Sequence, residues 1–242
     1  MKIANIVITV VSVICIGFVL FFSITPKTIL NTGVMLGGFI VPIILILITM
    51  ILEIKRIKDS NEKERIRKYW LFTLFIIYCL LLITVLFLNN QYRRESCSIG
   101  VANYSIQDNL KTINIIPFST IIGHISGAFD HNAMSLLNLF VNLILLAPMG
   151  FFIPILFRNK IDSTLKFIGV ILIVTVFIEI AQFFTLKGSA DIDDVILNTL
   201  GSVLTYLAMQ TKIVKKMLNR IFDIEIEWHN KKSRTKSRLL KK

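Results

Sequence analysis

Three aspartates open a stretch near the carboxyl end of the chain, "DIDDVILNTLGS", that otherwise runs apolar. Acidic residues are scarce in this sequence, 15 against 27 lysines and arginines, so their clustering needs a reason. Carboxylates at this spacing can hold a divalent cation, or they can accept the N–H groups that the first turn of a helix leaves without partners. Capping by Asp191 or Asp193 accounts for one or two of the carboxylates. We therefore expect a further role for the third.

The same stretch places Asp194, Asn198 and Gly201 on one face of a predicted helix, because residues three and four apart lie above one another. A polar stripe that ends at a glycine predicts the close approach of a neighbouring helix or of a ligand. Asp194 and Asn198 are accordingly our strongest candidates for a binding role.

Glu179 and Gln182 interrupt the preceding apolar run, and their spacing of three residues makes them project from the same side of a helix. A charged group at the centre of a membrane span costs about 2.5–3.5 kcal/mol, so Glu179 should face protein or water and have a partner. Either the two residues serve a site, which we favour, or Glu179 is a protonated and inert carboxyl.

Asn138 and Asn142 lie four residues apart on one helix face, ahead of a proline at position 148. The two asparagines either line a site or make hydrogen bonds between helices. Pro148 has no N–H to donate, so it is predicted to leave the carbonyl of Ile144 free and to kink the helix.

The elements that must position these residues are membrane spans. With 55% hydrophobic residues, 18 phenylalanines and a mean hydropathy of +0.73, the chain is too apolar for a soluble domain of its size. Its apolar runs approach the roughly 20 residues that cross a bilayer. We predict an all-α integral membrane protein with about six spans, at residues 3–24, 33–52, 69–88, 135–157, 167–184 and 195–214.

Basic residues set the predicted orientation. Most lysines and arginines fall in segments that lie on one side of the six-span model, which places both termini in the cytoplasm of a multi-pass cell-membrane protein. The first span is interpreted as a retained anchor. Because the positive charge lies beside spans, it indicates contact with anionic membrane lipids and not with nucleic acid. The apolar spacing in "KIVKKMLNRIF" predicts a helix that lies on the membrane.

The predicted outer loop runs from residue 89 to about 134 and contains "INIIPFSTIIGHISGAF". A crossing there would move the basic tail outside, so we interpret the segment as interfacial or re-entrant. The resulting division is a three-span region at 1–90, a region of loop and three spans at 91–211, and a basic tail at 212–242. The histidines and cysteines show no metal-ligand spacing, and we expect neither metal nor cofactor.

Four motifs in order, "NIIPF", "NLILLAPMGFFIP", "IEIAQFF" and "DIDDVILNTLG", make the stretch 114–206 resemble the VanZ-like family of bacterial membrane proteins. Family members often carry an arginine just before the aspartate motif, where this chain has Lys187 and Gly188. The residues that match the family pattern are Asn114, Pro117, Phe118, Asn142, Pro148, Gly150, Glu179, Gln182, Asp191, Asp194, Asn198 and Gly201.

The resemblance implies a polytopic protein of the Gram-positive cell envelope, linked in the founding members to low-level resistance to the glycopeptide teicoplanin. We expect a polar binding site near the outer leaflet, with candidate residues Asn114, Asn142, Glu179, Gln182, Asp191, Asp194 and Asn198.

Two classes of function fit such a site. The first, which we prefer, is a non-enzymatic factor that binds a lipid-linked cell-wall precursor, a lipophilic glycopeptide or a protein partner. The second is a membrane enzyme in which Asp191, Asp193 and Asp194 hold a metal ion against a lipid phosphate, with Glu179 as base. The preference rests on the lack of a nucleophile with a paired base in the sequence.

Overall fold

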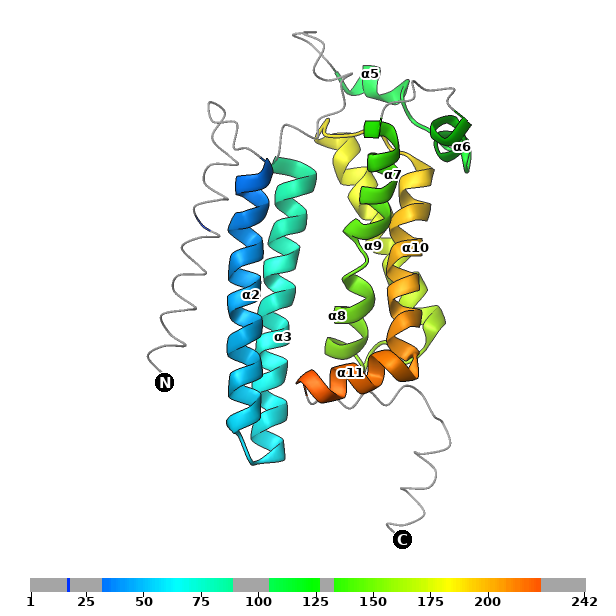
Figure 1. Ribbon diagram of the computed structural model, residues 1–242. Helices are drawn as coiled ribbons and strands as arrows, with labels where there is room; N and C mark the ends of the chain where they lie inside the picture. Colours follow the sequence, from blue (N-terminus) through cyan, green and yellow to red (C-terminus); the bar gives the residue numbers. More distant parts are fainter. Residues whose placement is uncertain (1–16, 18–31, 89–104, 127–132, 223–242) are drawn as a thin grey trace.

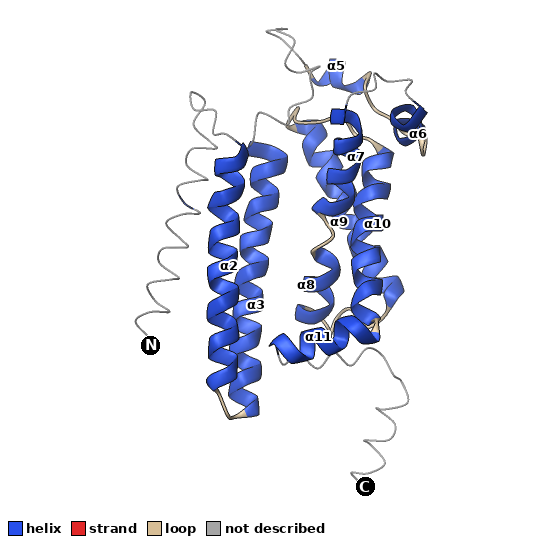
Figure 2. Cartoon of the chain, viewed as in Figure 1, coloured by secondary structure: helices blue, strands red, loops and turns tan. Residues whose placement is uncertain are grey.

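The structure is a computed structural model that describes residues 17, 32–88, 105–126 and 133–222. In these ranges every regular element is a helix, and the one β-type pairing is an isolated bridge (Figure 2). The elements are α2 (Thr32–Arg56), α3 (Ser60–Ile83), the π-helix η1 (Thr84–Leu88), α5 (Ile106–Leu110), α6 (Ser119–Ser126), α7 (Ala133–Leu145), α8 (Met149–Leu156), α9 (Thr164–Phe184), α10 (Ile192–Gln210) and α11 (Lys212–Phe222).

The described part contains four segments that are long and apolar enough to cross a membrane: Ser60–Phe87, Leu139–Leu156, Thr164–Phe184 and Ile192–Gln210. They coincide with the third to sixth predicted spans, and the all-α, multi-pass membrane class is confirmed. The second predicted span corresponds to α2, and the first lies outside the described residues. The total of six stays a prediction.

Helices α2 and α3 form an antiparallel hairpin (Figure 1). Asp59 begins α3 as its N-cap, because its carboxylate accepts the N–H of Glu62 at 2.9 Å. Apolar side chains such as Phe39 and Leu74 fill the space between the two helices, and Trp70 Nε1 donates to a Glu53 oxygen at 2.6 Å. The hairpin is therefore joined both by apolar packing and by a polar contact.

Helix α10 packs against α7, α8 and α9. Two glycines allow this close packing. A Cβ on Gly201 would lie 1.7 Å from the carbonyl oxygen of Leu143 on α7, and a Cβ on Gly150 of α8 would lie 2.3 Å from the carbonyl oxygen of Ser202. The close helix approach predicted for Gly201 is thus confirmed.

The fourth predicted span is divided into α7 and α8 by a turn at Leu146–Pro148. The turn pairs the Ile144 carbonyl with the N–H of Ala147 at 3.1 Å, so the prediction that this carbonyl is free is wrong. The neighbouring carbonyls receive side chains instead. Tyr78 Oη of α3 donates to Leu145 O, and Ser202 Oγ of α10 donates to Leu146 O, each at 2.7 Å. Non-helical backbone at membrane depth is thus satisfied by protein.

The two ends of the bundle are covered by different short helices (Figure 1). We call the end near α5 and α6 the pocket end and the opposite end the α11 end. The sixth predicted span reaches residue 214, but α10 ends at Gln210 and the extended backbone of Thr211 starts a new direction. Helix α11, predicted from the spacing of its apolar residues, then crosses the lower ends of α8 and α10 and reaches the hairpin, which extends past it (Figure 1).

Candidate functional site

Residues 105–126, the docked segment, lie over the pocket end. The segment begins with a capping box in which the Ser105 hydroxyl donates to Asp108 and holds the pKa of that carboxyl below its usual range. The buried Asn109 donates its amide to the carbonyls of Phe183 and Gly188 at 3.0 and 3.1 Å, which fastens the segment to the end of α9. The structure thus places the segment that was predicted to be interfacial or re-entrant against the pocket end of the bundle. Its re-entrant course through the membrane stays a prediction.

A backbone pairing joins the docked segment to the start of α10. Asn114 N–H donates to Ala190 O and Ile192 N–H donates to Asn114 O, each at 3.0 Å, which makes a parallel bridge between Asn114 and Asp191. Residues that are 77 positions apart in the chain therefore lie side by side at the site.

Asp193 caps α6 from another element. Its oxygens accept the N–H groups of Phe118, Thr120 and Ile121 at 2.5, 2.8 and 3.1 Å, and the residue is fully buried. Phe118 has a left-handed φ of 67°, which is uncommon for a residue other than glycine and is held here by the hydrogen bond of its own N–H. Asp193 therefore caps α6, and the cap of the helix that follows it is left to Asp191.

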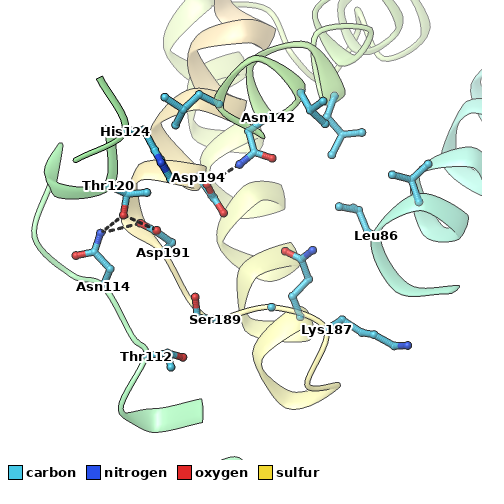
Figure 3. Close-up of a pocket in the computed structure, with 16 residues that line it drawn as sticks. Leu86, Thr112, Asn114, Thr120, His124, Asn142, Lys187, Ser189, Asp191 and Asp194 are labelled. Carbon is cyan, nitrogen blue, oxygen red and sulfur yellow. Dashed lines mark hydrogen bonds between the residues drawn. The ribbon is translucent and has the colours of Figure 1, made fainter. Parts of the chain in front are cut away.

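Asp191 is the N-cap of α10, as predicted, because it accepts the N–H of Asp193 at 2.9 Å. The same carboxylate accepts Asn114 Nδ2 at 2.9 Å and the Thr120 hydroxyl at 2.8 Å (Figure 3). Its own N–H lies 3.4 Å from a carboxylate oxygen of the buried Glu179. One aspartate thus links α10, the docked segment and α9.

Asp194 points to α7, where it accepts Asn142 Nδ2 at 2.5 Å (Figure 3). Asn198, one turn further along α10, is buried and donates its amide to the backbone carbonyl of Asp194 at 2.9 Å. The polar stripe predicted on α10 is therefore divided in two, because Asp194 reaches the neighbouring helix while Asn198 bonds within its own.

A pocket of about 430 Å³ lies between these groups. In Figure 3 Leu86 lies on the opposite side of the view from Asn114 and Asp191, with Asn142 between them. The lining consists of Val85, Leu86, Thr112, Asn114, Thr120, His124, Leu139, Val141, Asn142, Leu145, Gln182, Lys187, Gly188, Ser189, Asp191 and Asp194.

The structure brings most of the predicted candidates to this pocket. Its wall includes Asn114, Asn142, Gln182, Asp191 and Asp194, whereas Glu179 and Asn198 are buried behind the wall. Glu179 has a protein partner there, as its cost in a membrane predicted. For Asn138 the described residues give only its place in α7.

Sequence reasoning missed some of the lining side chains. Thr120 follows the Pro117 turn at the start of a short helix, a position where threonine often bonds locally, so its type alone gave no sign of a site. His124 and Ser189 carry no motif that points to a pocket. Lys187 was noted only as a departure from the usual arginine, although it lies in the wall.

The three aspartates do not converge on one point. Asp193 is used by α6, Asp194 faces α7, and Asp191 faces the docked segment. Within the described residues no group of three histidines, cysteines or acidic residues is placed to hold a metal ion. Asp191 and Asp194 therefore form part of the pocket wall, whereas Asp193, together with Asp191, attaches the docked segment.

These features define a class, namely multi-pass helical membrane proteins with a polar pocket at one end of the bundle. The family model described as VanZ/LLP1 matches residues 75–214, more than half of the chain, and the chain belongs to that family. The match includes every residue that lines the pocket. No match was found among curated proteins or among solved structures.

Proposed function

We propose that this VanZ-family protein is a non-enzymatic factor of the Gram-positive envelope. It binds an amphiphile in the pocket, either a lipid-linked cell-wall precursor or an acylated glycopeptide such as teicoplanin. The observation that carries the proposal is the two-sided lining of the pocket. It is apolar where Val85 and Leu86 of η1 and most of the α7 residues line it. It is polar where the docked segment, the end of α9, the loop after α9 and the start of α10 line it, and Asn142 is the polar residue that α7 adds. The positive-inside pattern supports an outer-leaflet position for the pocket end.

The apolar side suits a hydrocarbon chain. Val85 and Leu86 come from η1, and Leu139 and Leu145 come from α7, so these side chains lie on helices that border the membrane. An acyl or polyprenyl chain can therefore lie against them while its head group remains at the end of the bundle. Pockets that combine an apolar lining with a few placed polar groups are typical of small-molecule sites.

The polar side suits a head group rich in amides or hydroxyls. Asp191 and Asp194 supply acceptor oxygens, Lys187 supplies a donor, and Gln182 supplies both. Carboxylates and a lysine in one wall can meet a peptide-like or sugar-like ligand that carries both kinds of group. Ser189 adds a hydroxyl to the same wall.

The bonding of the aspartates favours binding over the metal-dependent enzyme. An ion held by three carboxylates needs their oxygens to point to a common centre. Asp193 instead directs both oxygens to backbone N–H groups of the docked segment. Asp191 and Asp194 likewise have bonds that attach neighbouring elements.

Drug susceptibility tests the proposal. A host with the gene should show a several-fold higher inhibitory concentration for an acylated glycopeptide than the host without it, and no rise for the same glycopeptide without its acyl chain. Asp194→Asn should remove this protection while membrane abundance stays near wild type, because the amide keeps the shape but loses the charge. Asp162→Asn is the matched control, since Asp162 is half exposed and pairs with Lys166 at the α11 end.

Two results would contradict the proposal in part or as a whole. Equal protection against both forms of the drug would rule out the acylated glycopeptide as the ligand and leave the lipid-linked precursor. Full protection by Asp194→Asn at normal abundance would show that the polar wall is not the binding site.

A further inference from the structure

Helix α11 has two apolar edges with different environments. Leu218 is 4% exposed and Phe222 packs on the apolar cluster of the α2–α3 hairpin, so one edge is held by protein. Ile213, Met217 and Ile221 are spaced four residues apart along the other edge and are 82%, 50% and 37% exposed. A second apolar edge, which the bundle does not cover, therefore runs the length of the helix.

A basic stripe lies beside this edge, because each of its residues directly precedes one of the exposed apolar residues and is turned from it by about 100° around the helix. Lys212, Lys216 and Arg220 recur at four-residue spacing and are exposed. The described helix contains no acidic residue, so the stripe carries one sign of charge. Near an anionic bilayer surface each such residue contributes attraction that falls off within a Debye length.

The position of α11 places both features at a membrane surface. Helix α10 is apolar enough to span the bilayer and ends at Gln210, and α11 begins two residues later. Figure 1 shows α11 running across the lower ends of α8 and α10 toward α3 and not along them, while the α2–α3 hairpin extends past it. Such a helix lies in the interfacial plane, with apolar side chains among the acyl chains and basic ones among the head groups.

We propose that α11 is an in-plane anchor that binds the anionic lipids of the leaflet at the α11 end. Ile213, Met217 and Ile221 enter the acyl region, and Lys212, Lys216 and Arg220 contact the lipid phosphates. Contacts of α11 with both α10 and α2 mean that this anchor also joins the hairpin to the rest of the bundle. Lipid binding at α11 therefore stabilises the packing of the hairpin against α7–α10.

A nitroxide at Met217→Cys in the full-length protein tests the proposal, with Cys15, Cys79 and Cys97 replaced by alanine. The protein is reconstituted in phosphatidylcholine nanodiscs with or without phosphatidylglycerol. The label should be accessible to oxygen and shielded from a water-soluble relaxation agent, and the shielding should increase with phosphatidylglycerol. A label at Asn219→Cys, beside the basic stripe, should remain accessible to the water-soluble agent.

Charge variants identify the lipid contact. Lys212→Glu with Lys216→Glu should remove the effect of phosphatidylglycerol on the Met217→Cys label. Lys58→Glu with Arg65→Glu changes the net charge equally but lies at exposed positions around the α2–α3 turn, so it should keep the effect. The shielding of the label in the two lipid mixtures is compared within each variant. A variant that is merely less stable is therefore not mistaken for one that has lost its response to phosphatidylglycerol.

Three outcomes would overturn the proposal. The first is a Met217→Cys label shielded from both oxygen and the water-soluble agent, which would indicate a protein partner on this edge. The second is a label that does not respond to phosphatidylglycerol. The third is an equal loss of the response in the two charge variants.

Discussion

The carboxylate of Asp193 joins the docked segment to α10. Asp193 accepts backbone N–H groups from the first turn of α6, and its complete burial keeps water from replacing them. A buried donor that loses its acceptor bears the full cost of desolvation, so the aspartate and the segment depend on each other. Asp191 strengthens the same attachment, because its carboxylate accepts a hydrogen bond from the Thr120 hydroxyl.

Asp193→Asn should loosen this attachment. An amide offers one acceptor oxygen, and its NH₂ group faces backbone donors, so we expect a loss of about 1–3 kcal/mol in the free energy of unfolding. Hydrogen exchange at the amides of Phe118, Thr120 and Ile121 should accelerate in detergent solution. The exposed Asp162→Asn serves as control. Unchanged exchange at these amides would contradict the role assigned to Asp193.

The local sequence pattern predicted which helix Asp191 caps, but it did not predict which helix Asp193 caps. Asp191 caps the helix that directly follows it, so its role could be predicted from adjacent residues. Asp193 caps a helix more than 70 positions earlier in the chain, and such a partner has no local signal. The pairing of Asp194 with Asn142 was hidden for the same reason.

At the scale of elements, α10 depends on two glycine contacts. The atoms nearest a Cβ at Gly201 belong to the backbone of α7, which cannot move aside as the end of a flexible side chain can. The contact brings Asp194 within reach of Asn142, so the geometry of the pocket depends on this helix spacing.

Gly201→Ala should therefore destabilise the protein strongly, and we expect a lower thermal midpoint and reduced membrane abundance. Gly169→Ala is the matched control, since a Cβ at Gly169 of α9 would meet nothing within 4 Å. That variant should be neutral or slightly stabilising, because alanine favours a helix by up to about 1 kcal/mol over glycine. Similar losses in both variants would contradict the close approach of α7 and α10.

The turn between α7 and α8 depends on side chains from two other helices. Tyr78→Phe and Ser202→Ala each remove one donor to its carbonyls, and hydrogen bonds between membrane helices average about 0.6 kcal/mol, with a maximum near 1.7. We expect each variant to lower the free energy of unfolding by an amount in this range, measured by denaturant titration in detergent. Tyr69→Phe, at an exposed position of α3, should have no effect. An equal effect of Tyr69→Phe would remove the support for these bonds.

The composition predicted the membrane spans, and Pro148 predicted an interruption of the fourth one. Neither predicted which groups donate hydrogen bonds to the backbone carbonyls at that interruption. Proline removes one donor whatever surrounds it, so a distortion near position 148 follows from chemistry alone. Which carbonyl needs a partner depends on how the turn re-pairs, and Ile144 finds Ala147. The donors Tyr78 and Ser202 come from other helices, so they depend on the assembled bundle.

At the scale of the whole molecule, the two ends of the bundle should lie on opposite sides of the membrane. The charge pattern places the α11 end in the cytoplasm. In a chain without its natural cysteines, a membrane-impermeant thiol reagent should label Lys111→Cys in intact cells and should label Asn61→Cys only after the cells are opened. Both positions are exposed, so access to the side chain is not limiting. Labelling of Asn61→Cys in intact cells would contradict the orientation.

The bridge between Asn114 and Asp191 also imposes an order on biosynthesis. The docked segment leaves the ribosome well before α10, since its partners follow 77 residues later. Until then the carboxylates that accept hydrogen bonds from this segment have not been synthesised. The donors that wait for them are Asn114, Thr120 and the first N–H groups of α6. Insertion of the last long helix thus completes the pocket, and a nascent chain that stops before Asp191 carries every helix through α9 but has no closed site.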